Sequence, residues 1–478
     1  MKYLLSGVGG IGLSALAWCL KVEGHEVYGS DRSYDQGLFP EKYQAIKDMG
    51  VTLVPQDGAL IEDGTIDYVI ASSAVEPKIP DIASALSHNV PIKKRAELLA
   101  ELLNGKRNSV AIAGTSGKST VTAITGFLAR ACDLDPTIIN GAVMPDFNAA
   151  QDSACSAFGN ARCAASDVFI AEACESDGSV VLYHPKISLI HNITLDHKPI
   201  AELRPLFQEL INHTKGAVIA NCDDTEVMAL DYSQAKMVGY SLDEHPKARF
   251  QAKNIALTAK GARFDLIIGG EVGGEAYEVH SPMLGRHNVQ NLLASFAIME
   301  ELGADIFDCI KAISGFSGVK SRLELIGHVG GITIIDDYAH NPDKIDAALS
   351  CVTQHAGRVL AYYQPHGFTP TKLMKQGYIE AFIKNLRAQD KLFLQDIYYA
   401  GGTVDRDISS QDLADGIKAS ALGSVSVFAD RAALVDAMLA EADAGDHILI
   451  MGARDDSIRY IAPEILARLT TQGSESAA

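Results

Sequence analysis

Short apolar runs alternate with amphipathic stretches along most of the chain, which is the pattern of strands that are each followed by a helix. Near the amino end, KYLLSGV, HEVYGSD and YVIASSAV are predicted as strands, and GIGLSALAWCLKVEG is predicted as a helix between the first two. Strands that alternate with helices in this way form open, mostly parallel α/β sheets. The stretch LNGKRN, near residues 103–108, is predicted to link this segment to the next.

Two further segments repeat the pattern. The strands predicted in the second are VAIAG, VFIAEA, ISLIHNI, AVIAN and RFDLII, and those in the third are ITIIDDY, RVLAYYQP, KLFLQDIY and HILIMGA. Domains usually hold ~100–200 residues, so this length favours three of them. We therefore expect an α/β protein with domains at 1–106, 107–320 and 321–470, followed by a flexible polar tail at 471–478.

Charge and hydropathy narrow the class of protein. A formal net charge of −19 argues against general binding to nucleic acid or to membrane surfaces, both of which favour basic patches. No apolar run approaches the ~18 residues of a membrane span. Glycines interrupt the amino-terminal apolar stretch too early for a secretory signal peptide. We therefore expect a cytoplasmic protein that binds neither nucleic acid nor membranes.

The eight cysteines are scattered along the chain and form no C-x-x-C pair. Metal sites and redox motifs usually place cysteines at such short spacings. We therefore expect reduced thiols throughout, as is usual in the cytosol. The cysteines are Cys19, Cys132, Cys155, Cys163, Cys174, Cys222, Cys309 and Cys351.

The most specific stretch is VAIAGTSGKST, where an apolar strand enters a glycine-rich turn that ends in Lys-Ser. The backbone N–H groups of such a turn and the amino end of the following helix point at one place and favour a phosphate there. Lys118 is predicted to reach the terminal phosphates of a nucleotide, and the Ser119 hydroxyl to ligate Mg²⁺. The residues expected to bind ATP here are Gly114, Thr115, Ser116, Gly117, Lys118, Ser119 and Thr120.

A second glycine loop, GVGGIG, lies between the first predicted strand and helix, and Asp31 follows the next strand. This G-x-G-x-x-G pattern is typical of dinucleotide-binding folds and, taken alone, would favour a dehydrogenase. A tight turn without a ligand is the structural alternative. The later phosphate loop makes the dehydrogenase less favoured, because hydride transfer has no use for ATP.

Acidic and histidine residues end two strands of the second segment. Glu172 lies in FIAEACESD, at the end of a predicted strand, where a carboxylate can hold Mg²⁺ on the phosphates of a neighbouring loop. Asp196 and His197 end the next strand in the same way, in HNITLDH. A solvated acidic loop and a structural histidine are the alternatives.

Six motifs together resemble one family. AGTSGKST, AEACESD, HNITLDH, LGRHNVQN, IDDYAHNP and YYQPHGFTPT occur in the order and at intervals similar to those of the Mur ligases of peptidoglycan synthesis, particularly their alanine-adding and tripeptide-recycling branches. The resemblance covers essentially the whole chain. It implies an amino-terminal Rossmann-like domain that binds a UDP-sugar, a central P-loop ATPase domain with a mostly parallel sheet, and a carboxyl-terminal Rossmann-like domain that binds an amino acid or peptide.

The resemblance also implies a reaction. In this family, ATP converts the lactyl carboxylate of UDP-N-acetylmuramate into an acyl phosphate, and an amine then displaces phosphate to leave an amide. Fixed cations stabilise the charge on the transferred phosphoryl group. By resemblance, the catalytic residues are Lys118, Glu172, His197, Arg322 and His340, the Mg²⁺ ligands are Ser119, Glu172 and His197, and the further ATP contacts are Asn288, Asn291, Arg322 and Asp337.

The remaining implied contacts concern the substrates. UDP-N-acetylmuramate, or a similar UDP-sugar, and an amino acid or short peptide are the expected partners of a monomer or homodimer. Arg95 is expected either near the sugar site or paired with a carboxylate. By resemblance, the substrate-binding residues are Gly7, Gly9, Gly10, Gly12, Ser30, Asp31, Ser73, Tyr338 and His340.

One departure from the family concerns the amine. The alanine-adding enzymes continue the QPH motif with two arginines, whereas this chain has Gly367 and Pro370 in their places. A guanidinium is the natural clamp for a carboxylate, and neither replacement offers a side-chain donor. Lys372 is a candidate substitute, although a point charge is less selective. The amine is therefore left open between L-alanine and a short peptide.

Three alternatives to this activity remain. The first is a Mur-type paralogue that joins another amino acid to another carboxylate. The second is a ligase relative that binds UDP-sugar or ATP without turnover, and the retained Lys118, Ser119, Glu172 and His197 argue against it. The third is the dehydrogenase suggested by the first glycine loop.

Overall fold

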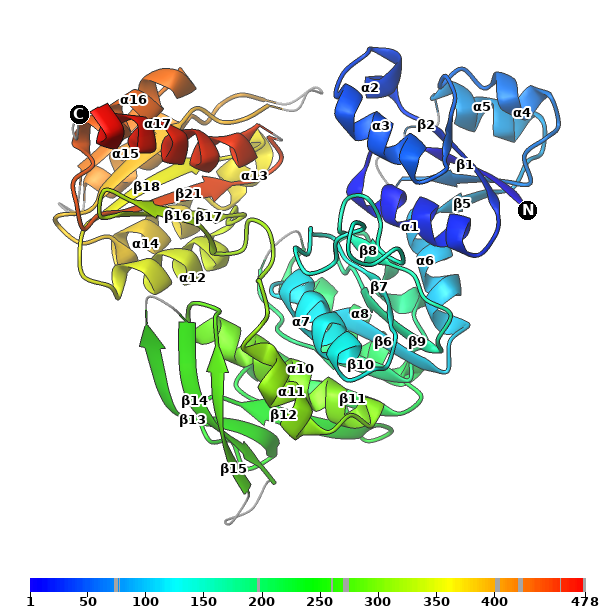
Figure 1. Ribbon diagram of the computed structural model, residues 1–478, viewed down its shortest axis with the longest axis horizontal. Helices are drawn as coiled ribbons and strands as arrows, with labels where there is room; N and C mark the ends of the chain where they lie inside the picture. Colours follow the sequence, from blue (N-terminus) through cyan, green and yellow to red (C-terminus); the bar gives the residue numbers. More distant parts are fainter. Residues whose placement is uncertain are drawn as a thin grey trace. The chain divides into compact units, whose positions relative to one another are not determined.

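The computed structural model describes residues 1–72, 76, 78–195, 198–258, 261–269, 275–399, 405–419, 424–455 and 457–475. Within these residues the strands form three mostly parallel sheets, of five, ten and six strands (Figure 1). This arrangement confirms the predicted α/β class with three sheets. Three residues considered above, Ser73, Asp196 and His197, lie outside the described residues.

The chain divides into two compact units. The first comprises Met1–Ala256, Ala262–Met283 and Asn288–Lys320. The second comprises Leu257–Gly261, Leu284–His287 and Ser321–Ala478. Apart from residues 257–261 of the second sheet, the first two sheets belong to one unit and the third sheet to the other.

The first sheet has the strand order β3-β2-β1-β4-β5, which corresponds to five of the six strands in the 3-2-1-4-5-6 order of dinucleotide-binding folds. Its strands pair in parallel, and apolar side chains cover both of its faces. The strands are β1 Lys2–Ser6, β2 Glu26–Ser30, β3 Thr52–Leu53, β4 Tyr68–Ala71 and β5 Ile92–Lys94, and the helices are α1 Ile11–Val22, α2 Arg32–Asp35, α3 Pro40–Asp48, α4 Ala59–Glu62, α5 Pro80–Ser87 and α6 Arg95–Asn104.

The second sheet has the order β15-β14-β13-β12-β11-β10-β6-β9-β7-β8. The strand that enters the predicted phosphate loop, β6, lies between β9 and β10, so the three motif-bearing strands are neighbours. Its strands are β6 Asn108–Ala113, β7 Thr137–Ile139, β8 Ala161–Arg162, β9 Val168–Glu172, β10 Ile187–Ile190, β11 Ala217–Asn221, β12 Lys236–Ser241, β13 Ala248–Thr258, β14 Gly261–Ile268 and β15 Glu275–Ser281, and its helices are α7 Lys118–Ala131, α8 Ile200–His213, α9 Thr225–Met228, α10 Arg286–Leu302 and α11 Ile306–Ile313.

An antiparallel extension at one edge of this sheet was not fully predicted. Only RFDLII, in β14, was recognised as a strand, whereas β13 and β15 flank it. Burial along β13 alternates between buried and exposed positions, as in a strand with one wet face. Charged and polar residues at the exposed positions hide such a strand from a search for continuous apolar runs.

The third sheet has the order β16-β17-β21-β18-β19-β20. Separate apolar cores cover its two faces, one beneath α12, α14 and α15 and the other beneath α16 and α17. Its strands are β16 Glu324–Val329, β17 Ile332–Asp337, β18 Val359–Gln364, β19 Lys391–Gln395, β20 Ser424–Phe428 and β21 His447–Gly452, and its helices are α12 Pro342–Thr353, α13 Phe368–Leu373, α14 Lys375–Asn385, α15 Ser410–Lys418, α16 Arg431–Glu441 and α17 Ile461–Glu475.

Two features of the chain ends bear on the sequence expectations. Helix α17 extends to Glu475, so residues 471–475, which were expected in a flexible tail, are helical. The last three residues lie outside the described part. Within the described chain, none of the helices combines the length and the apolar character needed to cross a membrane.

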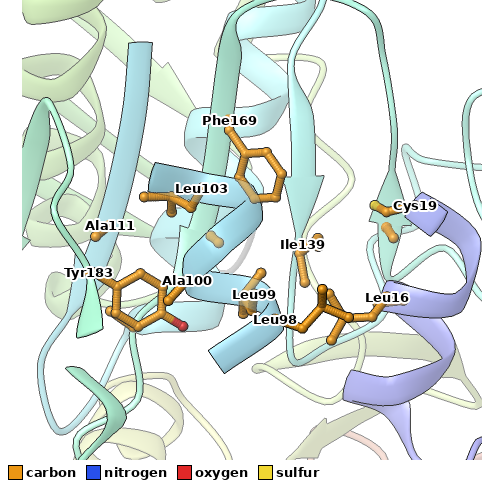
Figure 2. Packing of buried hydrophobic residues seen from close by; sticks show 14 of the residues in the cluster. Leu16, Cys19, Leu98, Leu99, Ala100, Leu103, Ala111, Ile139, Phe169 and Tyr183 are labelled. Carbon is orange, nitrogen blue, oxygen red and sulfur yellow. The ribbon is translucent and has the colours of Figure 1, made fainter. Parts of the chain in front are cut away.

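The first two sheets share one apolar core. Leu16 of α1 and Leu98 of α6 lie with Ile139 of β7 in a single buried cluster (Figure 2). The indole N–H of Trp18 donates to the carbonyl of Ala154 at 2.7 Å. Apolar packing and hydrogen bonding therefore join the first sheet to the second within the first unit.

The expectation that every cysteine is a free thiol is wrong for one pair. Cys19 of α1 and Cys163, just after β8, form a disulfide with a Cα–Cα distance of 5.5 Å. The partners are separated by 144 positions in the sequence, so their spacing carries no signal of the pairing. The shared core brings α1 to β8 and thereby creates it.

We expect reduction of this disulfide to lower the free energy of unfolding of the first unit by about 2 to 5 kcal/mol, because the bond closes a long loop in the unfolded chain. Trp18 adjoins Cys19 and is the only tryptophan, so its fluorescence during urea unfolding reports on this contact. The Cys19→Ser variant should have the lower midpoint and should not respond to reductant. An unfolding midpoint of the unaltered protein that is the same with and without dithiothreitol would contradict the prediction.

Candidate active site: two glycine loops and a histidine cluster

The phosphate loop has a backbone that only glycine adopts without strain. Gly114 has φ of +143° and Gly117 has φ of +83°, both in the region that favours glycine. A Cβ on Gly117 would lie 2.8 Å from His191 Cδ2 and 2.9 Å from Asn291 Oδ1. The loop is therefore packed against β10 and α10, and its shape depends on both glycines.

Hydrogen bonds fasten this loop to the segment after β10. The Oδ1 atom of Asn192 accepts from the Ser116 N–H and from the Thr115 hydroxyl, each at 2.8 Å. The Asn192 amide donates to the Ser116 carbonyl at 3.1 Å, and the Thr194 N–H donates to the Thr115 hydroxyl at 3.0 Å. These hydrogen bonds hold Thr115 and Ser116 in place. Asn192 lies in the HNITLDH motif, but no role was predicted for it.

Lys118 lies at the start of α7 and is paired with a buried carboxylate. Its Nζ lies 2.8 Å from Glu175 Oε2, and the two side chains are 14% and 4% exposed. Nζ also donates to the Gly114 carbonyl at 2.5 Å. Burial by itself would lower the pKa of Lys118, but Glu175, Cys174 and Glu172 together outweigh it, so the pKa is raised. The lysine is therefore charged and directed toward the loop.

The loop also holds a buried hydroxyl for which no partner is found in the described chain. That group is Ser116 Oγ. A buried polar atom without a hydrogen bond is costly, and in a phosphate loop an anionic oxygen is the natural acceptor. The hydroxyl of Ser119 and the backbone of Thr120 belong to the first turn of the 14-residue helix α7. These groups fit the phosphates of a nucleotide.

Glu172 ends β9 beside the phosphate loop, as predicted from the sequence. One of its oxygens accepts from the Gly141 N–H at 2.6 Å, which holds the carboxylate in place. No cluster of three or more His, Cys, Asp or Glu side chains suited to a metal is found among the described residues. That set excludes His197. Mg²⁺ commonly takes one or two protein ligands and completes its shell with phosphate and water, so Ser119 and Glu172 fit it.

The two asparagines predicted to bind adenine lie on α10. Asn291 Nδ2 donates to Asn288 Oδ1 at 2.8 Å, and both side chains are buried. Asn291 lies against Gly117, next to the phosphate loop. The pair is therefore part of the wall of this loop.

The first glycine loop follows β1 and is tied to the end of β2. The N–H groups of Gly7 and Val8 both donate to the Ser30 carbonyl, at 2.8 and 3.1 Å. Asp31 accepts from the Gly9 N–H at 3.0 Å and from the Ser33 N–H at 2.9 Å. Asp31 therefore holds the loop and caps α2 at the same time. Gly10 donates back to the Gly7 carbonyl, which completes the turn.

A buried aspartate beneath this loop was missed by the sequence analysis. Asp81 accepts from the hydroxyls of Ser6 and Ser30 at 2.9 and 2.5 Å, and from the Gly58 N–H at 3.2 Å. Burial raises the pKa of Asp81. Through Ser6 and Ser30, Asp81 joins the carboxyl ends of β1 and β2. A single carboxylate at the start of a helix has no sequence signature that distinguishes it from a surface residue.

Arg95 lies against the first glycine loop and also pairs with a carboxylate. Its Cδ lies 2.8 Å from the position that a Cβ on Gly12 would take. Its guanidinium pairs with Asp177 at 3.5 Å. Asp177 belongs to the acidic motif that follows β9, so Arg95 links the first glycine loop to the loop that carries Glu175.

In the second unit, Arg322, Asp337 and Tyr338 lie together. The Arg322 guanidinium lies 4.8 Å from the centre of the Tyr338 ring. Asp337 accepts from the Leu323 N–H at 2.7 Å. Burial raises the pKa of Asp337 to about 6, although Arg322 and the backbone N–H groups act against the increase. The structure thus brings together two residues that the resemblance assigned to ATP.

We expect Asp337 to make the second unit less stable as the pH rises. Its folded pKa of about 6 exceeds the ordinary 3.8, so the folded protein binds this proton more tightly. That contribution is complete below pH 3.8 and is lost as the pH rises through about 6. It amounts to at most about 3 kcal/mol. Thermal unfolding of Asp337→Asn at pH 5 and pH 8 should lack this slope, whereas Asp436→Asn, at an exposed carboxylate, should keep it. An opposite slope in the unaltered protein would contradict the prediction.

His340 and His366 form a cluster at the carboxyl ends of the third sheet. Their ring centres are 5.4 Å apart. His340 Nδ1 lies 2.8 Å from the Tyr338 carbonyl, and the Tyr378 hydroxyl donates to the His340 carbonyl at 2.8 Å. The backbone and ring of His340 are therefore both fixed. In open α/β sheets this edge is where ligands bind.

A second polar network at this edge had no sequence signal. Arg431 of α16 donates to Gln395 at 3.1 Å and to Gln364 at 3.5 Å, and it also pairs with Asp455. The Tyr362 hydroxyl bonds Gln395. Gln364 and Gln395 end β18 and β19, Asp455 follows β21, and Arg431 begins α16, so the network ties these four segments together. Only the sheet order reveals that they meet.

A phosphate-loop sheet accompanied by two further parallel α/β sheets defines a multidomain nucleotide-binding protein. Comparison with family models adds the particular family. Residues 5–107 match the "Mur ligase family, catalytic domain", residues 112–299 the "Mur ligase middle domain" and residues 321–454 the "Mur ligase, glutamate ligase domain". The chain belongs to the Mur ligase family.

Individual relatives agree with this assignment. The chain is 32% identical to the UDP-N-acetylmuramate–L-alanine ligase of Acaryochloris marina, with 98% of this chain and 96% of that protein covered. It is also 32% identical to the enzyme of that name from Rhodospirillum rubrum, with 94% and 91% covered. The UDP-N-acetylmuramate–alanine ligase of Thermotoga maritima has a similar fold, with a TM-score of 0.76 at 22% identity over 99% and 100% of the two chains. A murein peptide ligase of Psychrobacter arcticus gives a TM-score of 0.68 at 21% identity, with 98% of each chain covered.

Proposed function

We propose that this protein is an ATP-dependent amide-bond ligase that activates the lactyl carboxylate of UDP-N-acetylmuramate and joins it to L-alanine or a short peptide. The observation that carries the proposal is the phosphate loop, in which charged Lys118 is directed toward a backbone cradle, in a chain that matches three Mur ligase family models. The names of the relatives support the choice of UDP-sugar and of amine.

The reaction has two steps. A carboxylate oxygen of the acceptor attacks the γ-phosphorus of ATP, ADP leaves, and an acyl phosphate forms. The amine nitrogen then attacks the acyl carbon, inorganic phosphate leaves with the bonding electron pair, and the nitrogen loses a proton. Charge accumulates on the phosphoryl oxygens in the first step, so Lys118 would supply the principal protein charge at that point.

Mg²⁺ is part of the proposal. Ser119 at the start of α7 and Glu172 at the end of β9 would hold it, since both flank the phosphate loop. When bound, the ion would neutralise charge on the β- and γ-phosphates. His197, which the resemblance implies would hold a second metal ion near the acyl carboxylate, lies outside the described residues.

The remaining assignments follow the three sheets. We propose domains at 1–106, 107–320 and 321–470 that bind the UDP-sugar, ATP and the amine respectively. Their roles are supported by the glycine loop at the first sheet, the wall of asparagines beside the phosphate loop, and the histidine cluster at the third sheet. The proposed contacts are Gly7, Gly9, Gly10, Gly12, Ser30, Asp31 and Ser73 for the UDP-sugar, Asn288 and Asn291 for adenine, Arg322 and Asp337 for the phosphates and ribose of ATP, and Tyr338 and His340 for the amine.

A phosphate-release assay tests the activity. Purified protein, ATP, Mg²⁺ and UDP-N-acetylmuramate should release phosphate only when a suitable amine is added, and mass spectrometry should find the matching amide. The panel contains L-alanine and the tripeptide L-alanyl-γ-D-glutamyl-meso-diaminopimelate. No release with either amine would overturn the proposed substrate pair. Release with a different carboxylate instead would identify a paralogue. We place the reaction in the cytoplasm, where ATP is available.

A further inference from the structure

The place where two arginines were expected cannot hold the first of them without strain. Gly367 has φ of +72°, a conformation that side-chain-bearing residues rarely adopt. A Cβ there would also lie 3.2 Å from Pro370 Cδ. Pro370 itself lies in the first turn of α13, where its fixed φ suits the helix. The local backbone therefore disfavours an arginine at position 367.

Lys372, the substitute suggested by the sequence, is already paired. Its ammonium group bonds the carboxylate of Asp407, and this bond raises the pKa of Lys372. Both side chains are exposed. The pair neutralises the lysine charge, and it also fastens the segment before α15 to α13.

The residue next to Asp407 supplies a guanidinium at the same place. Arg406 lies with its guanidinium carbon 4.3 Å from the centre of the Tyr399 ring and 5.6 Å from that of Phe368. The two ring centres are 5.8 Å apart. Among the described residues no acidic partner is found for Arg406. Stacking on rings restrains a guanidinium and leaves its N–H edge available for a carboxylate.

Backbone contacts connect this arginine to the histidine cluster. The Gly367 N–H donates to the Tyr398 carbonyl at 2.9 Å, and the Tyr398 N–H donates to the Pro365 carbonyl at 2.8 Å. The loops after β18 and β19 are thus held together at the carboxyl end of the third sheet. Phe368, whose ring contacts the Arg406 guanidinium, follows His366 by two residues. The guanidinium is therefore anchored to the loop that contributes His366 to the cluster.

We propose that Arg406 binds the carboxylate of the incoming amine, in place of the two family arginines, and so determines which amines this ligase accepts. The inference rests on the proposed function, because it assumes that the amine binds beside His340 and His366. It predicts that the substrate is an amino acid or peptide with a free carboxylate within reach of the Phe368 and Tyr399 rings. An amine without such a carboxylate would be a poor substrate.

The test compares each amine with its carboxamide. With saturating ATP and UDP-N-acetylmuramate, phosphate release is measured for L-alanine against L-alaninamide, and for the tripeptide against its carboxamide. Arg406→Ala should raise KM for the better amine by about 10- to 100-fold, the loss typical of a charge-assisted hydrogen-bonded pair. Its KM for ATP should not change. The preference for carboxylate over carboxamide should disappear, and Arg406→Lys should recover part of it.

The matched control is Arg459→Ala. Arg459 is another exposed arginine of the second unit and lies 5.0 Å from the Tyr460 ring centre. Its removal should leave all constants unchanged, and melting temperatures should be equal across the set. An Arg406→Ala enzyme with an unchanged amine KM and an unchanged carboxylate preference would overturn the inference alone. No phosphate release from the unaltered enzyme with either amine would overturn the proposed function along with it.

Discussion

Replacing Lys118 with alanine is expected to lower amine-dependent phosphate release by about 10³-fold, because the substitution removes the fixed cation that faces the developing phosphoryl charge. Substrate binding through the remaining loop contacts should persist. The measurement is kcat at saturating ATP. Lys236→Ala is the control, since that lysine is 64% exposed and pairs with Glu301; its rate should be that of the unaltered enzyme.

The Lys118–Glu175 pair allows a second readout. Removing Lys118 alone leaves a buried carboxylate without its cation, so the melting temperature should fall. The double variant Lys118→Ala with Glu175→Gln should recover stability because the uncompensated charge is gone, while its activity stays low. A Lys118→Ala enzyme that turns over at the normal rate would contradict the assignment. Equal stability of the single and double variants would contradict the role of the buried pair.

Replacing Gly117 with alanine is expected to weaken ATP binding by about 10- to 100-fold. The added methyl group would meet His191 and Asn291 within 3 Å at a φ of +83°, and holding a residue in such a conformation costs of order 1 to 3 kcal/mol before the clash is counted. The loop must therefore move, and the N–H groups of the cradle move with it. Calorimetric titration with a non-hydrolysable ATP analogue measures the change.

Gly105→Ala serves as the matched control for Gly117→Ala. Gly105 ends α6 with φ of −73°, and a Cβ there would be no closer than 3.5 Å to its neighbours. Its affinity for the analogue should be that of the unaltered protein. Equal affinities for all three proteins would show that the shape of the loop does not depend on Gly117.

The sequence predicted the parts of the site that are local in the chain. A buried strand, a glycine turn and a helix in succession identify the phosphate loop, since the backbone of that loop is determined by residues within a few positions. Glu172 was placed correctly beside the loop because parallel strands end at one edge. The same reasoning located the first glycine loop, whereas the hydrogen bond from the Gly9 N–H to Asp31 was not predicted.

Contacts between distant segments could not be predicted from the sequence. Glu175 lies in the acidic motif AEACESD, but its pairing with Lys118 depends on how two loops fold back toward each other. The disulfide joins residues 144 positions apart, and Arg406 reaches Phe368 from a different strand connection. Such pairs form because the order of the strands in the folded sheet brings distant segments together. The spacing of residues along the chain does not reveal that order.

The shared core of the first two sheets has a consequence for how reactants meet. The proposed sugar-binding loop and the phosphate loop belong to one unit, joined by Leu16, Leu98 and Ile139 and closed by a disulfide. A ligase must bring a carboxylate to within bonding distance of a phosphorus atom, and two independently tumbling halves would lose rotational and translational freedom each time. In this chain the two loops lose that freedom once, when the protein folds. Each catalytic cycle therefore begins with the sugar-binding loop and the phosphate loop already fixed relative to each other.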